Sequence, residues 1–150
     1  MRAVLKLAVA LLAVALLVAA CGQVVAGHPV APSPVADRAL IADYFERSNA
    51  AARDGADAQK RFLDSTQHPD VERHCDLGDL IVLLEPSLGT IRADDRWQPT
   101  GAGSTPRGRV YRIAVLVTVR RDGTTLANQV GTMHVVVLDG AAYGFAPCPS

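Results

Sequence analysis

The sequence predicts an α+β domain in which N-terminal helices pack on a curved antiparallel β-meander. Apolar residues recur at helical spacing across Asp37–Asp54, and they alternate with polar residues across Arg109–Arg121. Asp-Gly pairs at 122–123 and 139–140 then mark two tight hairpin turns. We expect one domain over residues 36–150, a length sufficient to bury a hydrophobic core.

Two helices are expected before the sheet. The first covers Asp37–Asp54, with Ser33 or Asp37 as its N-cap and Gly55 as its stop. The second begins at Asp57, which caps it, and runs to about Thr66, burying Phe62 and Leu63. The face of the first helix that must be buried consists of Leu40, Ile41, Tyr44, Phe45, Ser48 and Ala52.

The remaining segments supply the strands. The short apolar run Leu80–Leu84 favours a buried strand, with a helix as the alternative, because it has only five residues. Leu88–Trp97 is interpreted as a second, more polar strand or an irregular edge, and Pro99–Pro106 as a loop. After Arg109–Arg121 the meander continues with strands at 124–138 and 142–146.

The turn at residues 122–123 predicts how the two long strands pair. A two-residue turn places Val119 opposite Leu126 and Tyr111 opposite His134, and the next turn places Phe145 opposite His134. One face, which must also receive the helices, then carries a candidate ligand pocket. A β-bulge would shift this register by one residue and dissolve the set. The candidate pocket residues are Tyr111, Asn128, Thr132, His134, Tyr143 and Phe145.

His134 is the titratable residue that this register places on the candidate pocket face. The simplest interpretation is an imidazole packed among aromatic rings; a ligand contact and acid–base catalysis are the alternatives. Neither Asp nor Glu of the meander shares this face, and a catalytic base needs a positioned partner, so we expect no enzyme and no cofactor. Trp97 is either a rim contact for a ligand or a cover for a core edge.

Residues 1–20 have the outline of a secretory signal peptide. Arg2 and Lys6 precede an apolar run of 14 residues, Leu7–Ala20, whereas a membrane-spanning helix needs about 20. The sequence Val18-Ala19-Ala20-Cys21 resembles the lipobox of bacterial lipoproteins. That resemblance implies cleavage before Cys21, a diacylated thiol as the lipid anchor, and a flexible tether over residues 21–35.

Two cysteines remain once Cys21 is assigned to lipid. An exported compartment permits Cys75 and Cys148 to pair, and we expect a disulfide between them. The competing possibility is a metal site. It is disfavoured because the chain lacks paired Cys-x-x-Cys or His-x-x-x-His spacing. The candidate ligands for that site are His68, His74, Cys75 and His134.

The predicted architecture resembles the nuclear transport factor two-like cone, also called cystatin-like, to which several small actinobacterial lipoproteins are similar. The resemblance implies a ligand, or in some members an acid–base pair, inside the cone. We therefore expect a non-catalytic lipoprotein at the outer face of the cytoplasmic membrane that binds an apolar small molecule or an envelope protein. A small lyase or isomerase and a purely structural surface protein are the alternatives. A formal net charge of +0 without a basic cluster argues against nucleic-acid binding.

Overall fold

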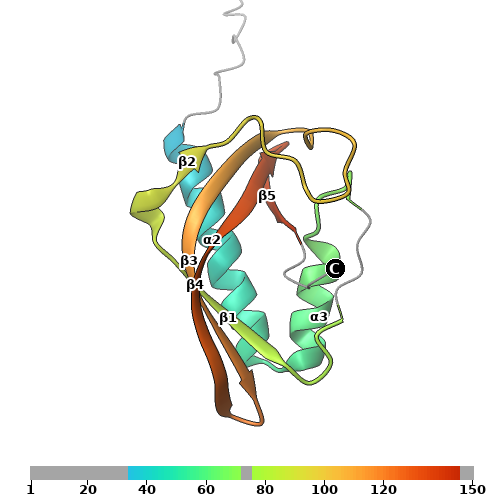
Figure 1. The fold of residues 1–150 in the computed structure, drawn as a ribbon, viewed down its shortest axis with the longest axis vertical. Helices are drawn as coiled ribbons and strands as arrows, with labels where there is room; N and C mark the ends of the chain where they lie inside the picture. The colour runs from blue at the N-terminus through green and yellow to red at the C-terminus, as the bar shows by residue number, and fades with distance from the viewer. Residues whose placement is uncertain (1–33, 72–75, 146–150) are drawn as a thin grey trace, which may run out of the picture. The chain divides into compact units, whose positions relative to one another are not determined.

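The computed structural model describes residues 34–71 and 76–145. The predicted signal peptide, Cys21 and the predicted Cys75–Cys148 disulfide lie outside these residues. The described part is α+β: two helices pack against one curled antiparallel sheet that forms a half-barrel (Figure 1). The predicted fold class is confirmed at this level.

The helices are α2 (Pro34–Arg53) and α3 (Ala56–Ser65). Proline is well suited to the first turn of a helix, so α2 begins three residues before the predicted start. Asp37 is consequently inside the first turn and buried, and the prediction that it caps the helix is wrong. The N-cap of α3 is Gly55, with φ of 112°, and no side chain caps this helix. The prediction that Asp57 is the cap is therefore also wrong, because Asp57 lies inside the first turn.

The sheet contains β1 (Ile81–Pro86), β2 (Arg92–Ala93), β3 (Arg109–Arg121), β4 (Thr124–Leu138) and β5 (Ala141–Gly144). Its order is β1-β3-β4-β5, and β2 pairs with the other end of β3. The strand at β1 confirms the favoured interpretation over the helical one. Of the two alternatives for Leu88–Trp97, the structure has the irregular edge: Leu88–Thr90 forms a short 3-10 helix, η2, and only Arg92–Ala93 forms a strand, β2.

Both predicted hairpin turns are present. Asp122 and Gly123 have φ of 48° and 79°, and Asp139 and Gly140 have φ of 50° and 79°. Positive φ at both central residues is what a type I′ turn requires, and this turn matches the right-handed twist of the strands it joins.

The predicted register of β3 and β4 is wrong by one residue. Val119 pairs with Ala127, while Arg120 pairs with Thr125, so Leu126 is an extra residue that forms a bulge. Beyond the bulge His134 lies opposite Arg112, and not opposite the tyrosine that the turn predicted. Because side chains alternate along a strand, the bulge moves every later residue of β4 to the other face of the sheet.

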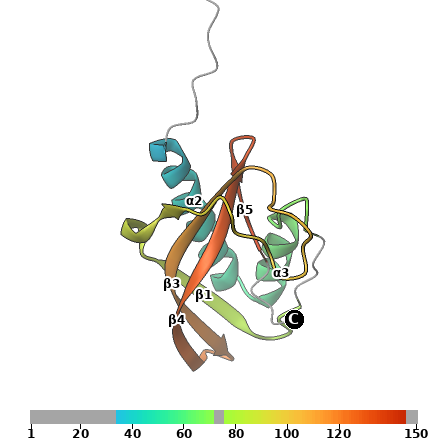
Figure 2. The same cartoon turned by 45° about the horizontal axis from the view of Figure 1, so that its top comes forward.

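The main core lies between the helices and the sheet face that they cover (Figure 2). Tyr44 and Phe45 of α2 are 1% exposed and pack with strand residues that share this face. In β4 these residues are Val135 and Val137, together with the half-buried Met133. On β3, the face that meets the helices carries the apolar side chains that were predicted to lie there. On β4 it carries the odd-numbered residues, whereas the predicted register placed the even-numbered residues on this face.

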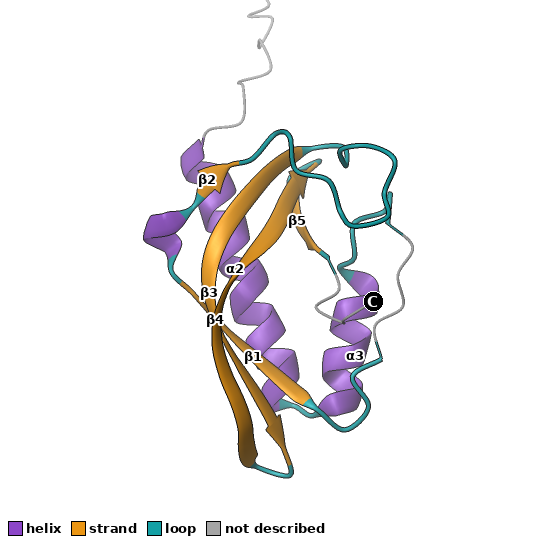
Figure 3. Cartoon of the chain, viewed as in Figure 1, coloured by secondary structure: helices purple, strands orange, loops and turns teal. Residues whose placement is uncertain are grey.

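The other face of the sheet is covered in part by the connection from β2 to β3, residues 94–108 (Figure 3). Pro99 and Pro106 of this loop are buried. Where the loop enters β3, Gly108 has φ of 101°, and a Cβ there would lie 2.6 Å from Cγ1 of Val136. Glycine therefore permits the close approach that buries Val136 and Val110 beneath the loop.

The two outer edges of the sheet differ. At β1, the Gln59 side chain donates to the Val82 carbonyl at 2.6 Å and accepts from the Val82 N–H at 3.0 Å. Asn49 pairs with Leu84 in the same way, at 2.7 and 2.8 Å. At β4, by contrast, β5 pairs with Val135–Leu138 alone. Among the described residues, no strand pairs with the outer edge of β4 before Val135.

Candidate ligand-binding groove

An open groove with a volume of about 450 Å³ follows the unpaired part of β4. By the observed register, Gly131 and Met133 belong to the helix-facing side of β4, while Thr132 and His134 belong to the other side. Residues from both faces can line one groove only if it passes along the edge of the strand. The described lining residues are Leu84, Trp97, Val117, Val119, Ala127, Gln129, Gly131, Thr132, Met133, His134 and Phe145.

The helix-facing wall of the groove is mainly apolar. Leu84, Val117 and Met133 come from three adjacent strands. Leu84 pairs with Val117 and Val117 with Gln129, and Met133 points to the same side as Gln129 because it lies four residues further along β4. Gly131 interrupts this wall, and a Cβ at Gly131 would meet no atom within 4 Å. The space beside Gly131 is therefore open to an occupant and not filled by a neighbouring side chain.

The other end of the groove is aromatic. The indole of Trp97 stacks on the His134 imidazole with ring centroids 4.0 Å apart and an interplanar angle of 13°. Its edge meets Phe145, with centroids 4.6 Å apart. Phe145 in turn stacks on His68 at 5.8 Å. The four rings thus form a continuous row in which each contacts the next, and this packing sets the orientation of Trp97 at the groove.

His134 has a carboxylate partner that the meander does not supply. Nε2 of His134 lies 3.1 Å from Oδ2 of Asp94, which follows β2 and whose backbone N–H donates to the Val110 carbonyl at 2.9 Å. Burial lowers the pKa of His134, although Asp94 opposes the shift. The imidazole is thus neutral at neutral pH. In the tautomer whose Nε2–H donates to Oδ2 of Asp94, the Nδ1 lone pair remains as a base.

The loop that carries Trp97 is anchored by His68. The Asp70 N–H donates to Nδ1 of His68 at 3.1 Å, so Nε2 carries the proton and donates to the Arg107 carbonyl at 2.8 Å. Asp70 also forms an ion pair with Arg107 at 2.7 Å, and the hydrogen bonds from Arg107 lower the pKa of Asp70 to about 2. These contacts tie the end of the loop to the segment after α3.

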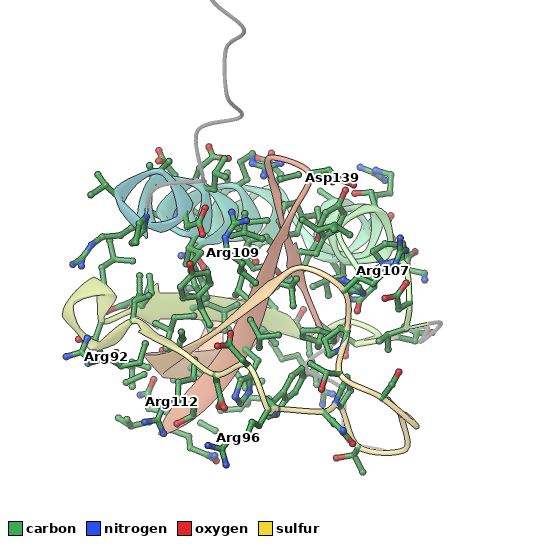
Figure 4. The ribbon with its side chains drawn as sticks, turned by 90° about the horizontal axis from the view of Figure 1, so that it is seen from above. Arg92, Arg96, Arg107, Arg109, Arg112 and Asp139 are labelled. Atoms are coloured by element: carbon green, nitrogen blue, oxygen red, sulfur yellow. The ribbon has the colours of Figure 1, made fainter. Side chains whose placement is uncertain are left out.

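Tyr111 belongs to a different cluster. Its hydroxyl donates to Oδ2 of Asp37 at 2.5 Å, and Arg109 donates to both carboxylate oxygens at 2.6 Å. Hydrogen bonds from Arg109 lower the pKa of Asp37 despite its burial, so this side chain is a carboxylate at neutral pH. Figure 4 shows Arg109 on the side of the helices, whereas Arg92, Arg96 and Arg112 lie on the opposite side of the sheet. The cluster joins α2 to β3.

The structure therefore divides the predicted pocket residues. Thr132, His134 and Phe145 line the groove, whereas Tyr111, Asn128 and Tyr143 do not. The expectation that all six share the helix-facing side is wrong because of the bulge. Asn128 accepts a hydrogen bond from Thr118 at 2.7 Å, and Tyr143 meets the edge of His68.

Asp94 was not among the predicted site residues. It comes from outside the meander, and neither its spacing nor its surroundings in the sequence connect it with His134. Trp97 was predicted either to contact a ligand at the rim or to cover an edge of the core. In the structure it lines the groove and also packs against the rings of His134 and Phe145.

Within residues 34–71 and 76–145, no group of three or more His, Cys, Asp or Glu side chains is placed to hold a metal ion. In the same ranges, no helix combines the length and the apolar character needed to cross a membrane. Comparison of the chain with protein-family models, curated proteins and solved structures found no match.

Proposed function

We propose that this protein is a lipid-anchored, non-catalytic lipoprotein of the cell envelope that binds a small, mainly apolar molecule in the groove along β4. The observation that carries the proposal is the groove itself. Its volume of about 450 Å³ lies within the range of small-ligand sites, and it combines an apolar wall with a few polar groups, as such sites do.

The lining favours a particular kind of molecule. An apolar body would fit beside Gly131 against Leu84, Val117 and Met133. A flat or unsaturated part would fit the aromatic end near Trp97. Since neutral His134 has one nitrogen engaged by Asp94, its other nitrogen can accept a hydrogen bond from a hydroxyl or amide of the ligand.

The location rests on the sequence. The Val18-to-Cys21 segment and the apolar run before it support a diacylated Cys21 at the outer face of the cytoplasmic membrane, and two acyl chains are sufficient for stable anchoring. We include in the proposal a Cys75–Cys148 disulfide and a nuclear transport factor two-like cone. The half-barrel with helices on one face is compatible with that cone. Intact-mass measurement of membrane-extracted protein, with and without reduction, tests the anchor and the disulfide.

Trp97, the single tryptophan of the sequence, provides the test of binding. The full chain is titrated with 8-anilinonaphthalene-1-sulfonate in detergent, and energy transfer from Trp97 to the dye is measured. Transfer reports dye bound near the groove, while the micelle background is common to all variants. We expect saturable transfer in the wild type and a loss of at least about ten-fold in affinity for Gly131→Leu, which fills the open space.

Gly89→Leu is the matched control, because Gly89 also has open space at its Cβ position but lies outside the groove. This variant should bind the dye as the wild type does. Equal binding by Gly131→Leu, or the lack of saturable transfer in the wild type, would contradict the proposal.

One observation favours a second candidate function, acid–base catalysis by a lyase or isomerase. The His134–Asp94 pair supplies the carboxylate that such an activity requires. The Kemp elimination of 5-nitrobenzisoxazole tests it. Nδ1 would take the proton from the C–H group, the C–H electron pair would form the nitrile, and the N–O bond would break to give a phenolate. Wild-type turnover that is lost in both His134→Gln and Asp94→Asn would support catalysis over binding alone.

A further inference from the structure

The unpaired edge of β4 is long, exposed and uncharged. Every residue across Thr124–Val130 is exposed, and Leu126 and Val130 are large apolar side chains that are 53% and 73% exposed. The segment Thr124–Met133 contains neither acidic nor basic residues. Proteins usually protect such an edge with a charge, a proline or a covering element, because its free N–H and C=O groups can pair with another strand.

The hydrogen bonds of β5 show which groups of β4 face outward. The Gly144 N–H donates to the Thr66 carbonyl, and the Gly144 carbonyl accepts from the His68 N–H, so Gly144 faces away from β4. The preceding residue, Tyr143, therefore faces Val136 and bonds to it. By alternation, the backbone groups of Asn128, Val130 and Thr132 also point to the outer edge.

A longer β5 would not meet these groups with donors of its own. Continuing the observed register, the residues that would donate to β4 after Phe145 are 147 and 149, and both are prolines without an N–H. A continued β5 would therefore lack the backbone N–H groups that the carbonyls along this edge of β4 require.

We propose that the edge of β4 pairs with the same edge of a second copy of this chain, antiparallel and about a two-fold axis at Val130. The axis makes Val130 of the two copies a hydrogen-bonded pair and sets Asn128 opposite Thr132 of the second copy. The two exposed valines then contact each other as cross-strand neighbours, which removes part of their apolar surface from water, and the sheets of the two copies become continuous.

Charge favours a second copy over a different protein. An edge that recognises a foreign strand commonly uses charges to select its partner and its register, and this edge has none. Identical uncharged edges meet without repulsion. The formal net charge is +0 for the whole sequence and 13 − 15 = −2 once Arg2 and Lys6 leave with the predicted signal peptide, so long-range repulsion between the copies is weak. This inference rests on the backbone edge and requires no ligand, although a second copy paired there would lie along the same part of β4 as the groove.

Sedimentation equilibrium of the full chain in density-matched detergent tests the proposal, using Val130→Lys as the variant. Two lysines would then face each other at the axis, and like charges directly opposite in a ladder are destabilising. We expect a wild-type dimer and a dissociation constant at least about ten-fold larger for Val130→Lys. Val35→Lys makes the same change at a residue that is 76% exposed on α2, and it should dimerise as the wild type does.

Amide hydrogen exchange at high and low protein concentration identifies the surface used. Exchange at Asn128, Val130 and Thr132 should slow as the concentration rises, because pairing engages these three N–H groups. A monomeric wild type would overturn the proposal. A dimer that is insensitive to Val130→Lys, or that leaves exchange at the three amides unchanged, would overturn it as well. Unaltered circular dichroism of both lysine variants confirms that each folds.

Discussion

The two outer edges of the sheet are treated in opposite ways. At β1, side-chain amides from two helices bond to the backbone as a neighbouring strand would, at Gln59 and Asn49. At β4, the backbone is covered by β5 at one end and is open over the rest. Covering an edge contributes stability and prevents association, whereas leaving an edge open permits binding. The groove and the proposed dimer contact both lie where the sheet is uncovered.

The largest expected effect comes from removing the cover of β1. Gln59→Met keeps the length of the side chain but leaves the N–H and C=O of Val82 buried without partners. Each orphaned group costs free energy, so we expect the free energy of unfolding to fall by about 3 kcal/mol in urea denaturation. Gln129→Met is the same change at the open edge, where the side chain is exposed, and it should alter stability by less than about 0.5 kcal/mol. Equal effects would remove the distinction between the edges.

Gly144 and Gly131 both lie on the helix-facing side of the sheet, but a Cβ atom has no room at Gly144 and open space at Gly131. A Cβ at Gly144 would lie 1.9 Å from the Tyr44 hydroxyl oxygen, and Tyr44 is 1% exposed and packed on all sides. We expect Gly144→Ala to lower the free energy of unfolding by about 2 kcal/mol through overpacking. Gly131→Ala should raise it by up to about 0.5 kcal/mol, since alanine costs less backbone entropy and has room. Thermal denaturation of the two variants measures the contrast, and destabilisation by Gly131→Ala would mean that the groove is closed.

The smallest effect is a pH dependence at His134, where the covered part of β4 begins. Burial lowers the folded-state pKa of His134 below its ordinary value of 6.5, so the unfolded chain binds a proton at a higher pH than the folded protein does. The contribution of neutral His134 to the free energy of unfolding is therefore fully present above pH 6.5 and is lost as the pH falls towards the folded-state pKa. Melting temperatures from pH 7.5 to 5 should fall less in His134→Gln than in the wild type. Parallel pH profiles would show that His134 is not buried as described.

Much of the groove could not be derived from the sequence, for one physical reason. Side chains alternate along a strand with a period of two, so a single bulge at Leu126 reverses the face of every later residue of β4. Nothing about a leucine between a threonine and an alanine marks it as the extra residue. The candidate pocket was consequently a mixture: His134, Thr132 and Phe145 reach the groove, while Tyr111 bonds to Asp37 in another cluster.

The cover of β1 did leave a signal in the sequence. Gln59 precedes Phe62 and Leu63 by three and four residues, which places an amide on the buried face of a short helix. A polar side chain at such a position needs a hydrogen-bond partner, and an amide can satisfy both groups of a strand residue. The pattern predicts that Gln59 has a partner, but it does not say which backbone group that partner is.

The sequence by itself determined the local elements of this protein: the amphipathic first helix, the alternating strands, and the two Asp-Gly turns with positive φ. These depend on periodicity and on backbone preferences within a few residues. The tertiary structure decided which face of β4 meets the helices, that Asp94 reaches His134, and which edge of the sheet stays open. Those features depend on which residues meet across strands and between elements, from Val119 with Ala127 beside the bulge to Asp94 with His134, 40 positions apart, and local patterns do not encode these contacts.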